Sequence, residues 1–348
     1  MAERELSWAR LNRALLARQL LLERADLTPV AAVERVGGLQ TQYSPSAYVG
    51  LWSRLAGFRR ADLTDALTRG RIIQGWVMRC TIHMVSAADH PPMTEAVRAH
   101  RRLLWSRDPR STGIDMAAAA DTVRDLLAGG PLTQAALVEG LLAAGFTKDA
   151  FAGVQLWIDL VRVPPAGTWE RPRAHVYGLA KAPRTPVDPA AAEELLARRY
   201  LRGYGPATPG DLGRYAGWTI THTKTVLDRL VLRTARDPDG TLLVDLPRAP
   251  LPDADTPAPV RFLGNFDGAL LLGHATRARL VPAEHRHEVF HVRKPQSMPT
   301  FLVDGRVAGT WRFTDGRVET APFEPLPPAA RDEVDAEAAR LTAFHLDG

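Results

Sequence analysis

The chain has 348 residues, 45% of them hydrophobic, and is long enough for two or three compact units with their own cores. The single cysteine, Cys80, excludes an internal disulfide and a cysteine-rich zinc site. No stretch has the apolar length of a signal-peptide core or a membrane span, which predicts a cytoplasmic protein without a membrane partner.

The formal net charge is +5, and 44 residues are lysine or arginine. Arginine forms paired hydrogen bonds to phosphates, so a basic balance of this kind favours a polyanionic partner such as DNA. No dense basic cluster is visible, so the charge alone is weak support for DNA binding. The only lysines are Lys148, Lys181, Lys224 and Lys294.

The first hundred residues predict helices followed by a β-hairpin, which is the order of a winged helix. A long helix opening near Asp89 carries several basic residues, which favour either a solvated face or a helix that follows DNA phosphates. Leucine spacing and capping residues predict helices at 8–23, 29–36, 45–55 and 62–68, and β-branched runs predict strands at 72–78 and 80–85.

The segments Gly130-Pro131-Leu132-Thr133 and Gly205-Pro206-Ala207-Thr208 share a Gly-Pro-x-Thr pattern, in which each threonine suits a helix N-cap. This repeat predicts two further winged-helix units. The first has helices at 133–144 and 148–161 and strands at 167–169 and 175–177. The second has helices at 209–216 and 221–230 and strands at 231–235 and 241–246.

Proline-rich stretches at 181–189 and 248–259 predict linkers. After them, strands are expected at 260–263, 269–272, 300–303, 307–313 and 318–319, with a hairpin turn at Asp304-Gly305 and a closing helix at 328–345. The predicted fold class is α+β: three tandem winged-helix units, a C-terminal antiparallel β element and a closing helix. The expected boundaries are 1–110, 111–187, 188–250 and 251–348.

Two amides flank one small residue in the stretch from Gly37 to Pro45, which reads GGLQTQYSP. The glycines are expected to end one helix, and Ser44 with Pro45 to cap and open the next. Residues two apart in an extended segment point the same way, so Gln40 and Gln42 could face one cavity. The alternative is an ordinary surface or capping role at a helix junction.

The stretch Gly38-Leu39-Gln40-Thr41-Gln42 resembles the Gln-x-Gln motif of the AlkZ-like winged-helix DNA glycosylases, and the resemblance covers nearly the whole chain. These bacterial enzymes excise bulky N7-alkylpurines and unhook interstrand crosslinks, including those of azinomycin-type antibiotics. The resemblance implies Gln40 and Gln42 as catalytic residues and double-stranded DNA with alkylated purines as substrate. Thr41 departs from the family, whose middle residue is often hydrophobic.

Two further stretches resemble motifs of this family. Arg79-Cys80-Thr81-Ile82-His83 matches an Arg-x-Thr-x-His strand, which implies that Arg79, Thr81 and His83 line the DNA cleft. The alternative is that Thr81 and His83 satisfy buried backbone groups. The stretch from Asn265 to Arg277 keeps His274 and Arg277 of a loop near the DNA, but Thr276 replaces an aspartate. Here the alternative is a turn stabilised by those two side chains.

No pair of carboxylates suited to ordinary glycoside hydrolysis is evident, and Asp267 is the nearest candidate. An N7-alkylpurine needs no such acid, because its ring is already cationic and departs as a neutral base. A neutral amide can orient water and solvate positive charge, but it cannot act as a strong base. The scarcity of lysine argues against a Schiff-base lyase, so a monofunctional enzyme is expected.

The histidines His285, His287 and His291 lack a nearby cysteine or a set of carboxylates suited to a metal site, so no metal and no cofactor are expected. The protein is expected to be a monomer that works at the nucleoid, in repair or in self-resistance to a genotoxic antibiotic. The main alternative is a non-catalytic winged-helix DNA-binding protein or transcriptional regulator. A protein that sequesters the free drug is a third possibility.

Overall fold

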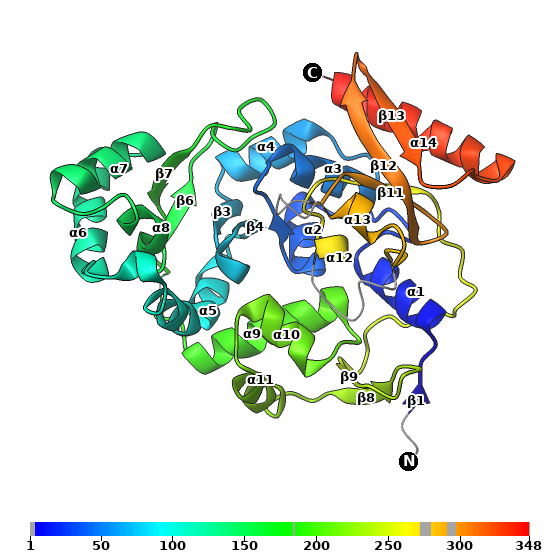
Figure 1. Ribbon diagram of the computed structural model, residues 1–348, viewed down its shortest axis with the longest axis horizontal. Helices are drawn as coiled ribbons and strands as arrows, with labels where there is room; N and C mark the ends of the chain where they lie inside the picture. Colours follow the sequence, from blue (N-terminus) through cyan, green and yellow to red (C-terminus); the bar gives the residue numbers. More distant parts are fainter. Residues whose placement is uncertain (1–3, 184, 272–279, 291–296, 348) are drawn as a thin grey trace.

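A computed structural model describes residues 4–183, 185–271, 280–290 and 297–347, and it mixes helices and sheets as the predicted α+β class requires (Figure 1). The first part of the chain forms helices and a short antiparallel hairpin in the predicted order. Thr28 caps α2 through a hydrogen bond from the Ala31 amide, and Gly37 ends it in the left-handed conformation. The elements are α1 (Trp8–Arg18), α2 (Pro29–Val36), β2 (Leu39–Gln40), α3 (Pro45–Arg54), α4 (Arg60–Thr68), β3 (Ile72–Trp76) and β4 (Ile82–Ser86).

The hairpin differs from its prediction at the turn between its strands. A short 3-10 helix, η1 (Met78–Cys80), occupies the turn, and β4 begins only at Ile82. Arg79 has a φ of 53°, a left-handed conformation that an extended strand does not allow. Arg79 therefore does not share a strand face with Thr81 and His83, and that part of the prediction is wrong.

The second part of the chain forms the lobe at the left of Figure 1. The helix predicted at 148–161 ends at Val154, and residues 160–162 form a strand instead. The strand predicted at 167–169 is part of a loop, and the helix at 116–126 was not predicted. The elements are α5 (His90–Trp105), α6 (Met116–Leu126), β5 (Leu132–Thr133), α7 (Gln134–Ala143), α8 (Ala150–Val154), β6 (Leu160–Arg162) and β7 (Val176–Leu179).

A single six-stranded sheet, in the order β2-β4-β3-β6-β7-β5, joins these two parts. The joint is the antiparallel pairing of β3 with β6, which places Gln74 opposite Arg162 and Gly75 opposite Val161. Gly75 is needed there because a Cβ atom would lie 2.7 Å from Nε2 of His90 on α5. The boundary predicted at residue 110 therefore divides strands of one sheet, and the division into winged-helix units stays a prediction.

The third part begins with a long helix, α9 (Pro189–Tyr204), that was not predicted. It packs against α1, α2, α5, α10 and α11, so it lies at the centre of the molecule. The N-cap predicted after it is confirmed: Thr208 caps α10 by accepting a hydrogen bond from the Asp211 amide. The elements that follow are α10 (Pro209–Ala216), α11 (Ile220–Leu227), β8 (Arg233–Arg236) and β9 (Leu242–Asp245), and β1 (Arg4–Glu5) pairs with β8.

The C-terminal part forms the predicted antiparallel sheet and closing helix, seen in orange and red in Figure 1. The strand predicted at 269–272 is wrong, because Gly268–Leu271 forms a short helix, α12. Residues Asp304 and Gly305 make the predicted hairpin turn with positive φ. The elements are β10 (Arg261–Leu263), α13 (Arg286–Val289), β11 (Thr300–Val303), β12 (Arg306–Thr314), β13 (Arg317–Pro322) and α14 (Pro328–Leu346). None of the described helices combines the length and apolar character needed to cross a bilayer.

A buried ion pair ties the first and third parts together. Arg18 of α1 donates to both carboxylate oxygens of Asp245 on β9 over 2.6 and 2.9 Å. The side chain of Arg18 is 0% exposed and that of Asp245 3% exposed. Arg18 also donates to the carbonyl oxygens of Leu201 and Pro250, which satisfies the rest of its guanidinium.

We expect Arg18→Met to lower the free energy of unfolding by about 3 kcal/mol, because it removes two buried hydrogen bonds to the Asp245 carboxylate and leaves Arg233 as its ion-pair partner. Urea denaturation followed by circular dichroism measures this. The control is Arg59→Met, which removes an ion pair whose arginine is 79% exposed and should change stability by less than about 0.5 kcal/mol. Equal unfolding free energies for the two variants would contradict the assignment.

Candidate functional site

The two glutamines lie where they were predicted, on a short extended segment between α2 and α3. Leu39 and Thr41 are buried, whereas Gln40 is half-buried and Gln42 is exposed. The segment is held by β4: Gln40 pairs with His83, and the Thr41 amide donates to the Ile82 carbonyl oxygen over 2.8 Å. The amides therefore lie on the solvent side of the segment, opposite the packed side chains of Leu39 and Thr41.

The glycine pair before the motif is a steric requirement. Both glycines have positive φ, and a Cβ atom on Gly38 would lie 3.2 Å from side chains of Met78 and Val85. The hydroxyl of Tyr215 on α10 donates to the Gly37 carbonyl oxygen over 2.6 Å. The third part of the chain thus helps to fix the position at which the glutamine segment begins.

Arg79 sets the orientation of the Gln40 amide. Its Nη2 donates to Oε1 of Gln40 over 2.7 Å. Arginine has only donors, so the oxygen of the amide must face Arg79 and the NH₂ group must point elsewhere. Gln40 consequently presents two donor hydrogens to the surroundings of the motif.

The turn that carries Arg79 is itself well supported. The guanidinium lies 5.9 Å from the ring centroid of Tyr215, within a buried group of tyrosines that includes Tyr200 and Tyr204. Burial lowers the pKa of Arg79, although arginine stays charged in proteins. A left-handed non-glycine residue that contacts a candidate catalytic side chain is the kind of outlier that gathers at functional sites.

His83 is buried, with 2% of its surface exposed. Its Nδ1 donates to the Thr81 carbonyl oxygen over 2.9 Å, so Nε2 is the unprotonated nitrogen and faces Nη2 of Arg79 at 3.5 Å. Burial and the Arg79 charge hold the pKa of His83 well below its usual value. Thr81 in turn donates to the Met78 carbonyl oxygen. Both side chains thus satisfy backbone carbonyls, and DNA contacts by Arg79, Thr81 and His83 stay predictions.

No sequence pattern pointed to Arg162 of β6, although it contacts the Ser44 side chain at the end of the glutamine segment. Arg162 is 3% exposed, and its Nη1 donates to the Ser44 hydroxyl over 3.3 Å. Its Nη2 donates to Nδ1 of His175 over 3.0 Å. Ser44 was expected to cap α3, but its side chain makes no such bond and accepts from Arg162 instead. Arg162 therefore contacts the end of the glutamine segment from β6, a strand that is far from the motif in sequence.

Asp267 is engaged in a second buried ion pair. Both of its carboxylate oxygens accept from Arg54, over 2.8 and 2.9 Å, and the Arg54 side chain is 0% exposed. This geometry suits a structural role for Phe266 and Asp267, and it means that Asp267 does not supply an acid to the glutamine site. The predicted residues His274 and Arg277 lie outside the described residues, as does Thr276.

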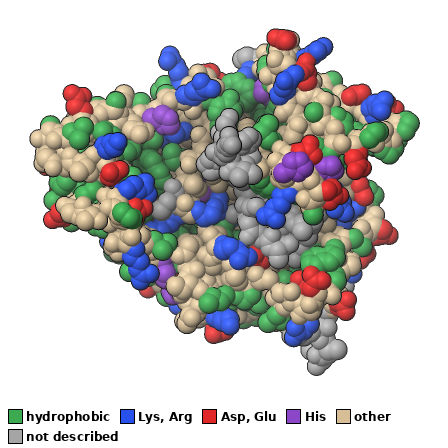
Figure 2. Space-filling view, viewed as in Figure 1, with side chains coloured by type: hydrophobic (Ala, Val, Ile, Leu, Met, Phe, Trp, Pro, Cys, Tyr) green, Lys and Arg blue, Asp and Glu red, His purple; other side chains and the backbone are tan. Residues whose placement is uncertain are grey.

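Of the other histidines noted in the sequence, His285 makes contacts of its own. His285 pairs with Glu288 over 2.8 Å and stacks on Phe323, and His291 lies outside the described residues. Within the part of the chain that is described, no three His, Cys, Asp or Glu side chains gather in a group able to hold a metal. Figure 2 shows Lys and Arg side chains spread over the middle of one face, which suits contact with phosphates.

Comparisons with known proteins agree over the length of the chain. A family model described as DNA glycosylase AlkZ-like matches residues 33–344. A curated protein of Streptomyces sahachiroi named "Interstrand DNA cross-link repair glycosylase" is 27% identical over 371 residues, covering 97% of this chain and 96% of that protein. The solved structure of Streptomyces sahachiroi DNA glycosylase AlkZ is similar in fold, with a TM-score of 0.77, 21% identity and 97% coverage of each chain.

The buried neutral His83 makes stability fall in acid. Its pKa is depressed in the folded state and near 6.5 in the unfolded chain, so below about pH 6.5 the unfolded state binds a proton that the folded state does not. Between pH 7 and 5 this site should cost wild type about 2 kcal/mol of unfolding free energy. We expect His83→Asn to lose less stability than wild type over that interval in urea titrations. Equal losses would contradict the neutral, buried assignment.

Proposed function

This chain belongs to the AlkZ-like family of DNA glycosylases and is itself a DNA glycosylase, and on that premise we propose that it hydrolyses the N-glycosidic bond of N7-alkylated purines in double-stranded DNA, including bulky and crosslinked ones. The observation that carries this proposal is the solvent-facing Gln40–Gln42 segment, with the Gln40 amide held by Arg79. Family membership sets aside the alternative of a non-catalytic DNA-binding protein.

The proposed substrate class follows from the absence of a strong acid or base at the site. The glutamine segment holds uncharged amides, and the nearest carboxylate predicted from sequence, Asp267, is paired with Arg54. Nothing in this arrangement protonates a leaving base strongly. An N7-alkylpurine already carries a positive charge, so when the bond from C1′ to N9 breaks, its electron pair neutralises the purine ring. Unmodified purines lack this advantage and should stay attached.

The orientation of Gln40 suggests different roles for the two amides. Gln40 turns its NH₂ group outward and can donate to the oxygen of a water molecule. Gln42 is exposed, and its Oε1 can accept a hydrogen from the same water. The remaining lone pair of the water then attacks C1′ as the base leaves, and the surplus proton passes to solvent. Such positioning lowers the barrier without a strong base.

The wider role follows from the same chemistry. The printed name of the S. sahachiroi relative refers to crosslink repair, which supports crosslinked purines as substrates here. We place the enzyme at the nucleoid, as a monomer that leaves an abasic site, either in general alkylation repair or in self-resistance to a DNA-alkylating antibiotic. Arginines on its surface would hold the phosphates of the duplex.

We expect Gln40→Ala and Gln42→Ala to lower the rate of N7-methylguanine release by about a hundredfold or more, since each removes a group that positions the reacting water. DNA affinity, measured by fluorescence anisotropy, should change little. Alkali-labile strand breaks report the abasic product. The control is Gln134→Ala, which removes an exposed glutamine from α7 and should leave the rate unchanged. Full activity in both motif variants, or efficient release of undamaged adenine, would overturn the proposal.

The two amides should respond differently to a carboxylate. Gln40→Glu keeps an acceptor for Arg79 but loses the donor hydrogens, so its rate should fall by about a hundredfold while its stability is maintained. Gln42→Glu keeps an acceptor for the water, so its rate should stay within about tenfold of wild type. Single-turnover rates on one N7-methylguanine duplex measure both. The reverse order of the two rates would refute the assigned roles.

A further inference from the structure

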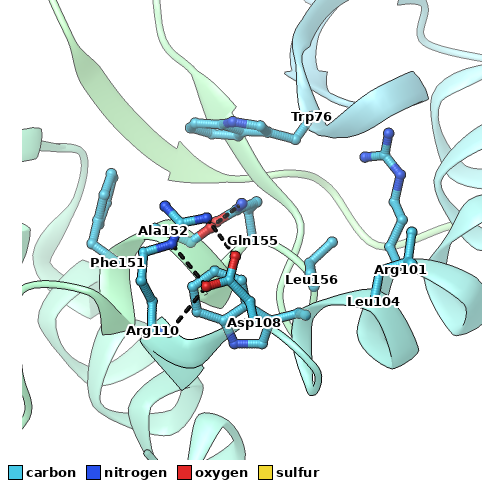
Figure 3. A pocket seen from close by; sticks show the side chains of 10 residues that line it. Trp76, Arg101, Leu104, Asp108, Arg110, Phe151, Ala152, Gln155 and Leu156 are labelled. Atoms are coloured by element: carbon cyan, nitrogen blue, oxygen red, sulfur yellow. Dashed lines mark hydrogen bonds and ion pairs between the residues drawn. The ribbon is translucent and has the colours of Figure 1, made fainter. Parts of the chain in front are cut away.

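A cavity of about 420 Å³ opens between β3, α5 and α8 (Figure 3). In the close-up, Trp76 lies across one side, and Gln155, Asp108 and Arg110 lie across the other. Phe151 closes one end, and Arg101 and Leu104 stand at the opposite end. The full lining is Trp76, Arg101, Leu104, Trp105, Asp108, Arg110, Phe151, Ala152, Gln155 and Leu156.

The walls of this cavity combine aromatic rings with guanidinium groups. Trp76 is backed by Tyr177, with ring centroids 5.0 Å apart, which holds the indole in place. On the other side the Arg110 guanidinium lies over the Trp105 ring at 5.3 Å and is paired with Asp108. Arg101, which is 2% exposed, is part of the lining at one end of the cavity.

The cavity is close to the glutamine motif because β4 pairs both with the glutamine segment and with β3, whose Trp76 lines the cavity. The Thr41 amide donates to the Ile82 carbonyl oxygen, and Ile82 is also the cross-strand partner of Trp76. Two strand spacings therefore separate Thr41 from Trp76, a distance of about 10 Å. A duplex whose damaged nucleotide lies at Gln40 and Gln42 would bring its neighbouring nucleotides within reach of the cavity.

We propose that this cavity binds a nucleobase of the lesion-bearing duplex, displaced from the helix and distinct from the base that is excised. The inference rests on the proposed function and adds a second contact to it. The volume falls within the range of small-molecule sites. Aromatic faces accept any base by stacking, and arginine adds stacking and hydrogen-bond donors.

Such a contact would explain how an open site handles a bulky lesion. A crosslinked purine is tied to the opposite strand and cannot be withdrawn into a closed pocket. Displacing an undamaged base costs unstacking energy, which binding in the cavity would return. The space left in the helix would then let Gln40 and Gln42 approach C1′ of the damaged nucleotide.

A double-mutant cycle between enzyme and DNA tests this. Binding is measured in a Gln42→Ala background with duplexes that carry one N7-methylguanine. In matched duplexes a single base is replaced by a tetrahydrofuran abasic residue, either opposite the lesion or next to it. At one of these positions, the effect of removing the base should differ between the parent and its Trp76→Leu variant by about fivefold to a hundredfold.

The remaining variants separate stacking from folding. Trp76→Phe keeps a ring and should keep most of the coupling, whereas Phe151→Leu, on a different element, should lose it. Leu142→Ala, at an exposed position of α7, is the control and should behave like the parent. Additive effects at every position would overturn the proposal, and so would coupling only to an adduct that carries its own aromatic ring. If wild type released no base, the proposed function would fail while the coupling stayed measurable.

Discussion

Two backbone pairings, Leu39 with Met84 and Gln40 with His83, hold the glutamine segment on the edge of the six-stranded sheet. Everything proposed for the site depends on them. They place Gln40 within 2.7 Å of the Arg79 guanidinium, and Arg79 can take that position only because η1 turns it into a left-handed conformation. Tyr215 of α10 packs against Arg79 at this turn, and Tyr200 and Tyr204 of α9 pack against Tyr215. Three parts of the chain that are distant in sequence therefore determine one amide orientation.

In the proposed function, the selectivity of the site for activated leaving groups comes from its two uncharged amides. A site with strong acids and bases could attack many glycosidic bonds, whereas two amides accelerate only a reaction whose leaving group is already activated. The carboxylate that might have broadened the chemistry, Asp267, is held by Arg54 within the interior. The buried, neutral His83 likewise adds no proton donor near Gln40. The proposed selectivity for damaged bases thus depends on the absence of a strong acid or base at the site as much as on the contacts that the site makes.

Local patterns predicted much of the fold, and long-range contacts account for most of what was missed. Thr28, Gly37 and Thr208 marked helix ends correctly because capping depends on neighbouring residues alone. The stretch from Arg79 to His83 resembles a strand, but the chain turns through η1 there and the Arg79 side chain lies against Tyr215 of α10. The helix α9 was not predicted because the prolines before it indicated a linker, whereas Asp188 and Pro189 at the end of that stretch cap and begin the helix. Arg162 could not be found from sequence, since its contact with Ser44 spans 118 positions.

The shared sheet also limits how the protein can be divided. Cutting the chain after α5 would remove β6 and leave β3 with unpaired backbone groups along one side. An exposed strand edge of that kind invites pairing with other chains, so a fragment holding only the glutamine segment would tend to aggregate. The glutamine segment thus depends on the neighbouring lobe for a complete sheet.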